Sequence, residues 1–129
     1  MLVDSSAWVE YLRKTGSWHD RAVRDALEAD DVHTVDTIRL ELLCGAGSEA
    51  LAADLVRLLD SCTDLEIAPG QDVESAGEVY RACRLQGETI RRANDCLIAA
   101  VAIRHGIPVL HCDADFDAIA RHTALRVVR

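Results

Sequence analysis

The sequence lacks the features that mark membrane-spanning and secreted proteins. No apolar run approaches the ~20 residues that a transmembrane helix needs. Met1 leads directly into a short apolar segment, without the basic region and cleavage site of a secretory signal. Half of the 129 residues are hydrophobic and 28% are charged, as in ordinary soluble globular proteins. We therefore expect a cytoplasmic protein with no membrane contact, folded as a single domain over residues 1–129.

The cysteines lack the spacing of a disulfide framework or a zinc site. They are odd in number and widely spaced, and no C-x-x-C pair occurs among Cys44, Cys62, Cys83, Cys96 and Cys112. Both a set of disulfides and a structural zinc ion are therefore disfavoured. We interpret these cysteines as small apolar core or helix residues in a reducing compartment.

Several catalytic and nucleotide-binding motifs are also missing. There is no G-x-x-x-x-G-K-[ST] or G-x-G-x-x-G loop, which disfavours nucleotide binding of those kinds, and no G-x-S-x-G. The five histidines form no H-x-x-x-H pair, so each is interpreted as a surface or structural residue. His111 is the exception, because it lies two residues before Asp113 and is close enough to touch a substrate or tune a site there.

An excess of positive charge is absent as well. The net charge of −8 is unlike that of most nucleic-acid-binding proteins, which are basic. A metal bound by some of the acids would cancel part of this charge. The visible basic clusters are Arg91/Arg92 and Arg13/Lys14, and an ordinary solvated helix surface is the alternative interpretation of both, favoured for Arg13/Lys14.

What the chain does contain is a set of acids in apolar surroundings: Asp4, Glu41, Asp95, Asp113 and Asp115. Buried carboxylates are destabilising unless they are paired or bind a metal. If the fold brings these acids together, they form a site suited to a hard divalent cation. Metal-dependent chemistry is then indicated, with phosphodiester cleavage as the leading candidate.

The hydrophobic pattern predicts alternating strands and helices. Strands are expected at 1–4, 32–35, 65–68, 108–112 and 125–128. Helices are expected at 7–12, 18–29, 36–44, 72–85 and 116–121, in a segment capped by Ser48, and in a long segment that begins at Thr89 or Asn94 and ends at His105. This order indicates an α/β fold with helices on both faces of a small, mainly parallel sheet.

In such a sheet, ligands bind outside the carboxyl ends of the strands. Asp4 ends the first predicted strand and Asp113 follows the fourth, so the two carboxylates face one crevice if those strands are neighbours. Glu41 shares a helical face with Ile38 and Cys44, a poor place for a solvated acid. Four such acids converging on one crevice are hard to explain as helix caps or surface charges.

Asp95 lies on the apolar face of its predicted helix. Its neighbours at helical spacing are Ile98, Ala99 and Ala102, so the carboxylate should point where core residues point. A structural ion pair with Arg91, one turn earlier, is the alternative to a functional role.

Four segments together resemble a known family. They are LVDSSAW at 2–8, ELLCG at 41–45, NDCLIAA at 94–100 and DADF at 113–116. In order and spacing they are similar to the PIN-domain ribonucleases, specifically the toxins of VapBC-type toxin–antitoxin modules, over the whole chain.

The resemblance implies a three-layer α/β/α sandwich and an endoribonuclease that depends on Mg²⁺ or Mn²⁺. It further implies a homodimer, and a cognate antitoxin whose C-terminal segment wraps the toxin and blocks the site. The family's metal-binding acids correspond to Asp4, Glu41, Asp95 and Asp113, with Asp115 as a frequent additional acid. One departure is His111, where the family often has Ser or Thr.

Two other functions stay open at this point. An aspartate-based phosphotransfer protein is disfavoured, because Asp4–Ser5–Ser6 replaces the D-x-D of aspartyl phosphatases and Lys14 is the only lysine. A catalytically silent module that only binds a partner would not need all of the acids. Trp8 and Trp18 flank the first helix and either belong to a dimer or antitoxin surface or pack in the core.

Overall fold

Four short strands form one parallel sheet. The computed structural model describes residues 1–129, and the strands lie in the order β3-β2-β1-β4. They are β1 (Leu2–Val3), β2 (His33–Thr34), β3 (Thr63–Asp64) and β4 (Val109–Leu110). All three strand pairings are parallel, which confirms the predicted α/β fold.

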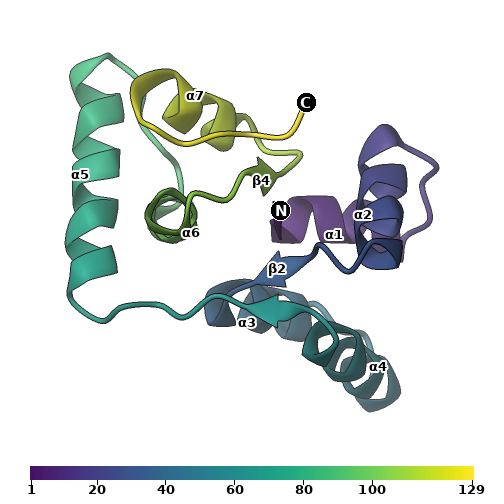
Figure 1. The fold of residues 1–129 in the computed structure, drawn as a ribbon. Coiled ribbons are helices and arrows are strands. Elements are labelled where there is room, and N and C mark those ends of the chain that lie inside the picture. Colours follow the sequence, from purple (N-terminus) through teal and green to yellow (C-terminus); the bar gives the residue numbers. More distant parts are fainter.

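Helices on both sides of this sheet make up most of the protein (Figure 1). They are α1 (Ser5–Leu12), α2 (Trp18–Glu28), α3 (Asp36–Cys44), α4 (Glu49–Asp60), α5 (Gln71–Leu85), α6 (Ala93–His105) and α7 (Ala114–His122). In Figure 1, α5, α6 and α7 lie together on the left and α1 and α2 on the right, with strands between them. None of these helices is both long and apolar enough to cross a membrane.

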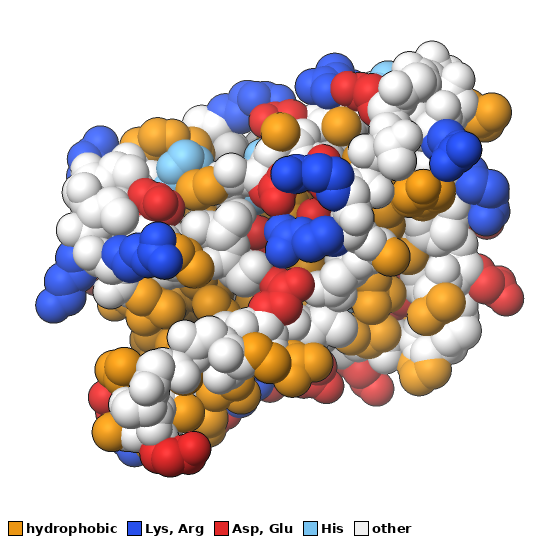
Figure 2. Space-filling view, turned by 180° about the vertical axis from the view of Figure 1, so that it is seen from behind, with side chains coloured by type: hydrophobic (Ala, Val, Ile, Leu, Met, Phe, Trp, Pro, Cys, Tyr) orange, Lys and Arg blue, Asp and Glu red, His pale blue; other side chains and the backbone are white.

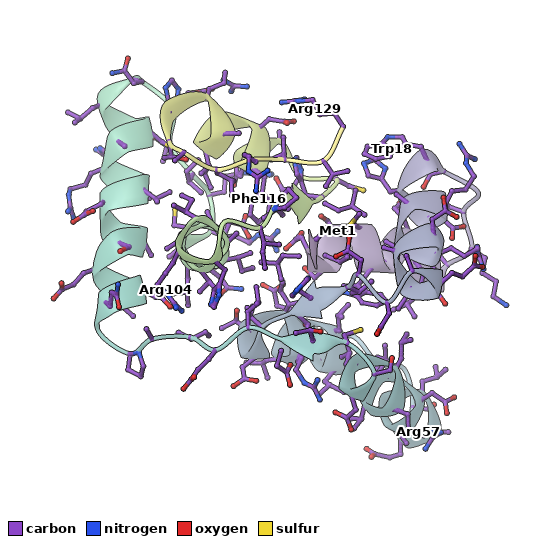
Figure 3. All side chains as sticks on the ribbon, viewed as in Figure 1. Met1, Trp18, Arg57, Arg104, Phe116 and Arg129 are labelled. Carbon is purple, nitrogen blue, oxygen red and sulfur yellow. The ribbon has the colours of Figure 1, made fainter.

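The core is built around α6. Its run of small and branched residues from Ile98 to Ala102 is buried, so the helix lies close against its neighbours. Phe116 of α7 and Trp8 of α1 are fully buried and are the largest side chains in the core, and Figure 3 shows Phe116 in the interior, near α6 and β4. This packing fixes the first turn of α6, where Asp95 lies, relative to the end of β4.

Two predicted strands are wrong in position or extent. The third strand lies at Thr63–Asp64, not at 65–68, because the amides of Thr63 and Leu65 donate to β2 and the chain then leaves the sheet. Thr63 and Asp64 are exposed, so backbone pairing rather than apolar burial places this edge strand. The segment 125–128 makes a single parallel bridge, between Val127 and Val109.

Three helices begin at other residues than the pattern predicts. α1 begins at Ser5 rather than 7, and Asp4 is its N-cap, since the carboxylate of Asp4 accepts a hydrogen bond from the amide of Ser6. Asp113 caps α7 in the same way, so that helix begins at Ala114 rather than 116. The helix ending at His105 begins at Ala93, between the two predicted starts. Two of the candidate acids are therefore helix caps.

All five cysteines are free, and Cys83 and Cys96 are buried as expected. Cys112 differs from the expectation, because it is exposed in the link between β4 and α7.

Candidate metal centre

The strand ends bring the first and last acids to the same edge of the sheet. β1 pairs with β4 in the register Leu2 to Val109 and Val3 to Leu110, and the amide of Asp4 donates to the carbonyl of Leu110. The first and fourth strands are therefore neighbours in the sheet, as the proposed meeting of Asp4 and Asp113 requires. Asp4 therefore leaves the sheet beside the segment that carries Asp113.

Three carboxylates form the centre of this edge. Asp95, Asp113 and Asp115 each offer one oxygen, and these oxygens lie within 4.8 Å of one another. Asp95 is fully buried, as its helical face predicted, and Asp115 is nearly so. Asp4 and Glu41 lie outside this trio but near it, since the charge of Asp4 acts on Asp95 and that of Glu41 acts on Asp4.

Two of the acids carry oxygens that nothing in the protein satisfies. Both carboxylate oxygens of Asp95, and Oδ1 of Asp4, are buried without a hydrogen-bond partner. Burial raises the pKa of Asp95 to about 7, against the lowering effect of Arg92. Burial also raises the pKa of Asp4, although Ser6 donates two hydrogen bonds to its Oδ2. Such carboxylates are destabilising without a cation.

Two arginines cover the acids from the solvent side. Arg91 Nη2 lies 2.6 Å from Asp113 and Arg91 Nε lies 3.4 Å from Asp115. Arg92 Nη2 lies 3.0 Å from Asp113, and Arg92 Nε lies 3.5 Å from Asp95, too far for a hydrogen bond. In Figure 2 basic side chains lie directly against acidic ones near the middle of the face.

These contacts do not include the ion pair between Asp95 and Arg91 that the sequence left open as the alternative to a functional role. Arg92 is the partner, because α6 begins only at Ala93 and helical spacing does not extend back to Arg91. The two arginines also act on Asp113. Burial raises the pKa of Asp113, but the amide of Asp115 and the two guanidinium groups together lower it by more. The net result is a pKa below the ordinary value.

Polar neighbours orient the remaining carboxylates, and the sequence interpretation assigned none of them this role. Ser5 Oγ donates to Glu41 Oε2 at 2.6 Å, and Asn94 Nδ2 donates to Glu41 Oε1 at 2.7 Å. Ser6 Oγ donates to Asp4 and accepts the amide of Cys112 at 3.0 Å. The only signal in the sequence is that each of these residues lies within two positions of an acid, Asp4 or Asp95.

The arrangement is suited chemically to a hard divalent cation. Its donors are carboxylate oxygens from the residue after β1, from α3 and α6, and from the N-cap and first turn of α7, and Mg²⁺ and Mn²⁺ prefer such ligands. The unsatisfied oxygens of Asp4 and Asp95 are the observation that favours a bound cation, because they need a positive partner.

Residues 1–122 match the family model described as the PIN domain. The chain belongs to the PIN-domain family. Ribonuclease VapC11 of Mycobacterium tuberculosis H37Rv is 46% identical to this PIN-domain chain over 128 residues, which cover 98% of the chain and 96% of the relative.

Solved structures share the PIN fold at lower identity. VapBC2 from Rickettsia felis, bound to a DNA fragment from its promoter, aligns with a TM-score of 0.76 at 14% identity and covers 98% of this chain and 96% of that one. VapBC-5 from M. tuberculosis, a member of the VapBC family of toxin–antitoxin systems, aligns with a TM-score of 0.64 at 21% identity, covering 99% and 96%. These alignments confirm the predicted three-layer fold.

His111 has a local structural role in this PIN-domain protein. It is 7% exposed, and its Nδ1 accepts the amide of Asp113 at 3.2 Å, so a neutral ring carries its proton on Nε2. Burial lowers the pKa of His111, which keeps the ring neutral. His111 thus fixes the backbone of Asp113, a form of tuning that the sequence interpretation had left open.

A large apolar groove of about 800 Å³ ends at this acidic site. α1, α3 and α4 line it, and Ser5, Glu41 and Arg92 form its end nearest the acids. Figure 2 shows hydrophobic side chains on the protruding part of the molecule at lower left and on the body above it. Among the lining residues, Leu40 and Leu51 are more than half exposed.

Proposed function

We propose that the protein is a divalent-metal-dependent endoribonuclease that acts as the toxin of a type II toxin–antitoxin pair. The observation that carries the metal dependence is the group of buried carboxylate oxygens on Asp4 and Asp95 that have no partner within the protein. The ribonuclease activity is supported by 46% identity to ribonuclease VapC11 over nearly the full length of both chains.

The proposed ligands are the acids of the site. Asp4, Asp95 and Asp113 bind Mg²⁺ or Mn²⁺ directly or through water, and Glu41 and Asp115 complete the site or hold a second ion. When bound, the ion supplies a nucleophilic water near neutral pH and neutralises charge on the phosphate oxygens.

The other side chains of the site prepare it for RNA. Ser6 holds Asp4 through one oxygen and leaves the other oxygen free, while Ser5 and Asn94 fix the orientation of Glu41. Arg91 and Arg92 pair with the acids in the absence of a cation. When the acids take a cation, the two guanidinium groups become available to the phosphates of the RNA.

The test is cleavage of structured and single-stranded RNA in Mg²⁺, in Mn²⁺ and in EDTA. Wild-type protein and Asp25→Asn, which alters an exposed acid of α2, should cleave only with metal. Asp4→Asn and Asp95→Asn should fold but not cleave. Full activity of Asp95→Asn contradicts the ligand assignment, and failure of the wild type to bind Mn²⁺ favours the alternative of a silent partner-binding module.

The apolar groove fits the antitoxin part of the proposal. A protein segment with an apolar face, laid against α1, α3 and α4, would bury the exposed leucines and end over the acids. The comparison with the VapBC structures supports such a partner. Leu51→Asp should weaken antitoxin binding measured by titration, and unchanged affinity would exclude this groove.

Assembly is proposed on the resemblance, and the compartment on the sequence. We propose a homodimer, to be tested by the mass of the purified protein in solution, and a cytoplasmic location, where RNA and free cysteines are expected together.

A further inference from the structure

A second hollow, of about 540 Å³, is lined in part by Asp113 but by neither Arg91 nor Arg92. It is formed by the start of α2, the end of β4, the start of α7 and the last residues of the chain. Its volume is within the range of ~300–1,000 Å³ in which small ligands bind. Its lining includes Trp18, His19, His111, Asp113, Asp117 and Arg129.

An exposed tryptophan forms one wall of this hollow. Trp18 is 43% exposed, whereas the other tryptophan, Trp8, is fully buried. The ring of His19 lies under Trp18 with 3.9 Å between the centroids, so one face of the indole is supported. A tryptophan in this position is a platform for a flat ligand, because its apolar face is otherwise in contact with water.

The opposite wall is polar, and the side chain of Asp117 in it is only loosely paired. Asp117 Oδ1 lies 3.5 Å from Arg129 Nη2 and 3.6 Å from His111 Nε2, and neither contact is a hydrogen bond. Donors and an acceptor therefore remain available to a ligand. Figure 3 shows Trp18 at the start of α2 and Arg129 at the C-terminus, both in the region beyond β4.

We propose that this hollow binds a nucleobase of single-stranded RNA, stacked on Trp18, from a nucleotide next to the cleaved phosphate. The inference rests on the proposed ribonuclease function and extends it to substrate recognition. Asp113 belongs both to the acidic trio and to the lining of the hollow, so RNA held at the acids passes directly over it.

The lining favours RNA over a protein ligand. Proteins recognise the sequence of an RNA through unstacked bases. These bases stack on aromatic or arginine side chains and present their edges to hydrogen-bonding groups of the protein. Trp18 provides the stacking surface, Asp117 and His111 face the base edge, and Arg129 is 71% exposed and able to meet an adjacent phosphate. A protein segment would instead be expected on the more apolar groove described above.

The test compares cleavage kinetics of wild type and Trp18→Ala on short single-stranded RNA in Mg²⁺. The substrates are the intact RNA and a series of otherwise identical oligonucleotides, each of which lacks one base. We expect Trp18→Ala to lower kcat/KM about 10-fold, mainly through KM, on the intact RNA. The difference should vanish when one particular base beside the cleaved bond is absent. Trp18→Phe should retain most of the stacking, and Leu85→Ala, which alters an 84% exposed side chain of α5, is the matched control.

The outcomes separate this inference from the function on which it rests. If the wild type does not cleave RNA with any metal, the proposed function fails. If the wild type cleaves and Trp18→Ala is equally active, the subsite is wrong. An equal loss on every oligonucleotide, with or without the base, indicates a structural role and also overturns it. A change confined to oligomeric mass or antitoxin affinity assigns Trp18 to a protein interface instead.

Discussion

Replacing Asp95 by asparagine should stabilise the metal-free protein at neutral pH, although the residue is buried in the core. Asp95 has no hydrogen-bond partner, and its one ion pair, to Arg92, is 3.5 Å long. Asparagine keeps the shape and removes the buried charge. Arg92 keeps its other partner, Asp113.

The size of the effect follows from the shifted pKa. Burial raises the pKa of Asp95 from 3.8 to about 7, and this rise corresponds to about 4 kcal/mol of folding free energy above pH 7. Below the unfolded value both states are protonated, so nothing is lost there. As the pH rises toward the folded value, the folded state must hold a proton that the unfolded state has released, and stability falls. This figure already includes the attraction of Arg92. Because the asparagine amide would itself be buried without a hydrogen-bond partner, we expect a net gain of about 2 kcal/mol at pH 8.

The measurement is thermal unfolding in EDTA between pH 4 and pH 8. Asp95→Asn should unfold roughly 5–10 °C higher than wild type at pH 8, and the difference should vanish toward pH 4. Saturating Mn²⁺ should raise the Tm of the wild type but not of the variant. The control is Asp25→Asn, which should follow the wild type. A variant less stable than the wild type at pH 8 in EDTA would refute this reasoning, because it would mean that the buried charge is already compensated.

Three further perturbations test other parts of the structure. Arg92→Gln removes the guanidinium group that competes with a metal ion for Asp95 and Asp113. The Mn²⁺ affinity measured by calorimetry should therefore rise while the affinity for RNA falls. A loss of both affinities would contradict this. Phe116→Ala empties a fully buried position and should destabilise the protein by about 3–5 kcal/mol in urea unfolding. Arg104→Gln leaves the buried Asp72 without its 2.8 Å partner, and should destabilise by about 3 kcal/mol, whereas an unchanged midpoint would show that water replaces the pair.

Local sequence pattern was enough to predict the parts of the site that depend on neighbouring residues. Asp4 and Asp113 were placed at strand ends because a short apolar run precedes each of them. Asp95 was placed on an inward face because helical spacing puts Ile98 and Ala99 beside it, and its full burial confirms this. Strand ends and helix faces are set within a few residues, so a local pattern suffices to predict them.

Which groups meet in the site depends on contacts between distant parts of the chain. Ser6 and the amide of Cys112 are 106 residues apart, and their hydrogen bond exists because β1 pairs with β4. The pairing of Arg92 rather than Arg91 with Asp95, and the exposure of Trp18, likewise depend on how the loops before α6 and α2 leave the core. A local pattern sets which way a side chain points along its own element, but the partner it meets depends on packing between elements distant in the chain.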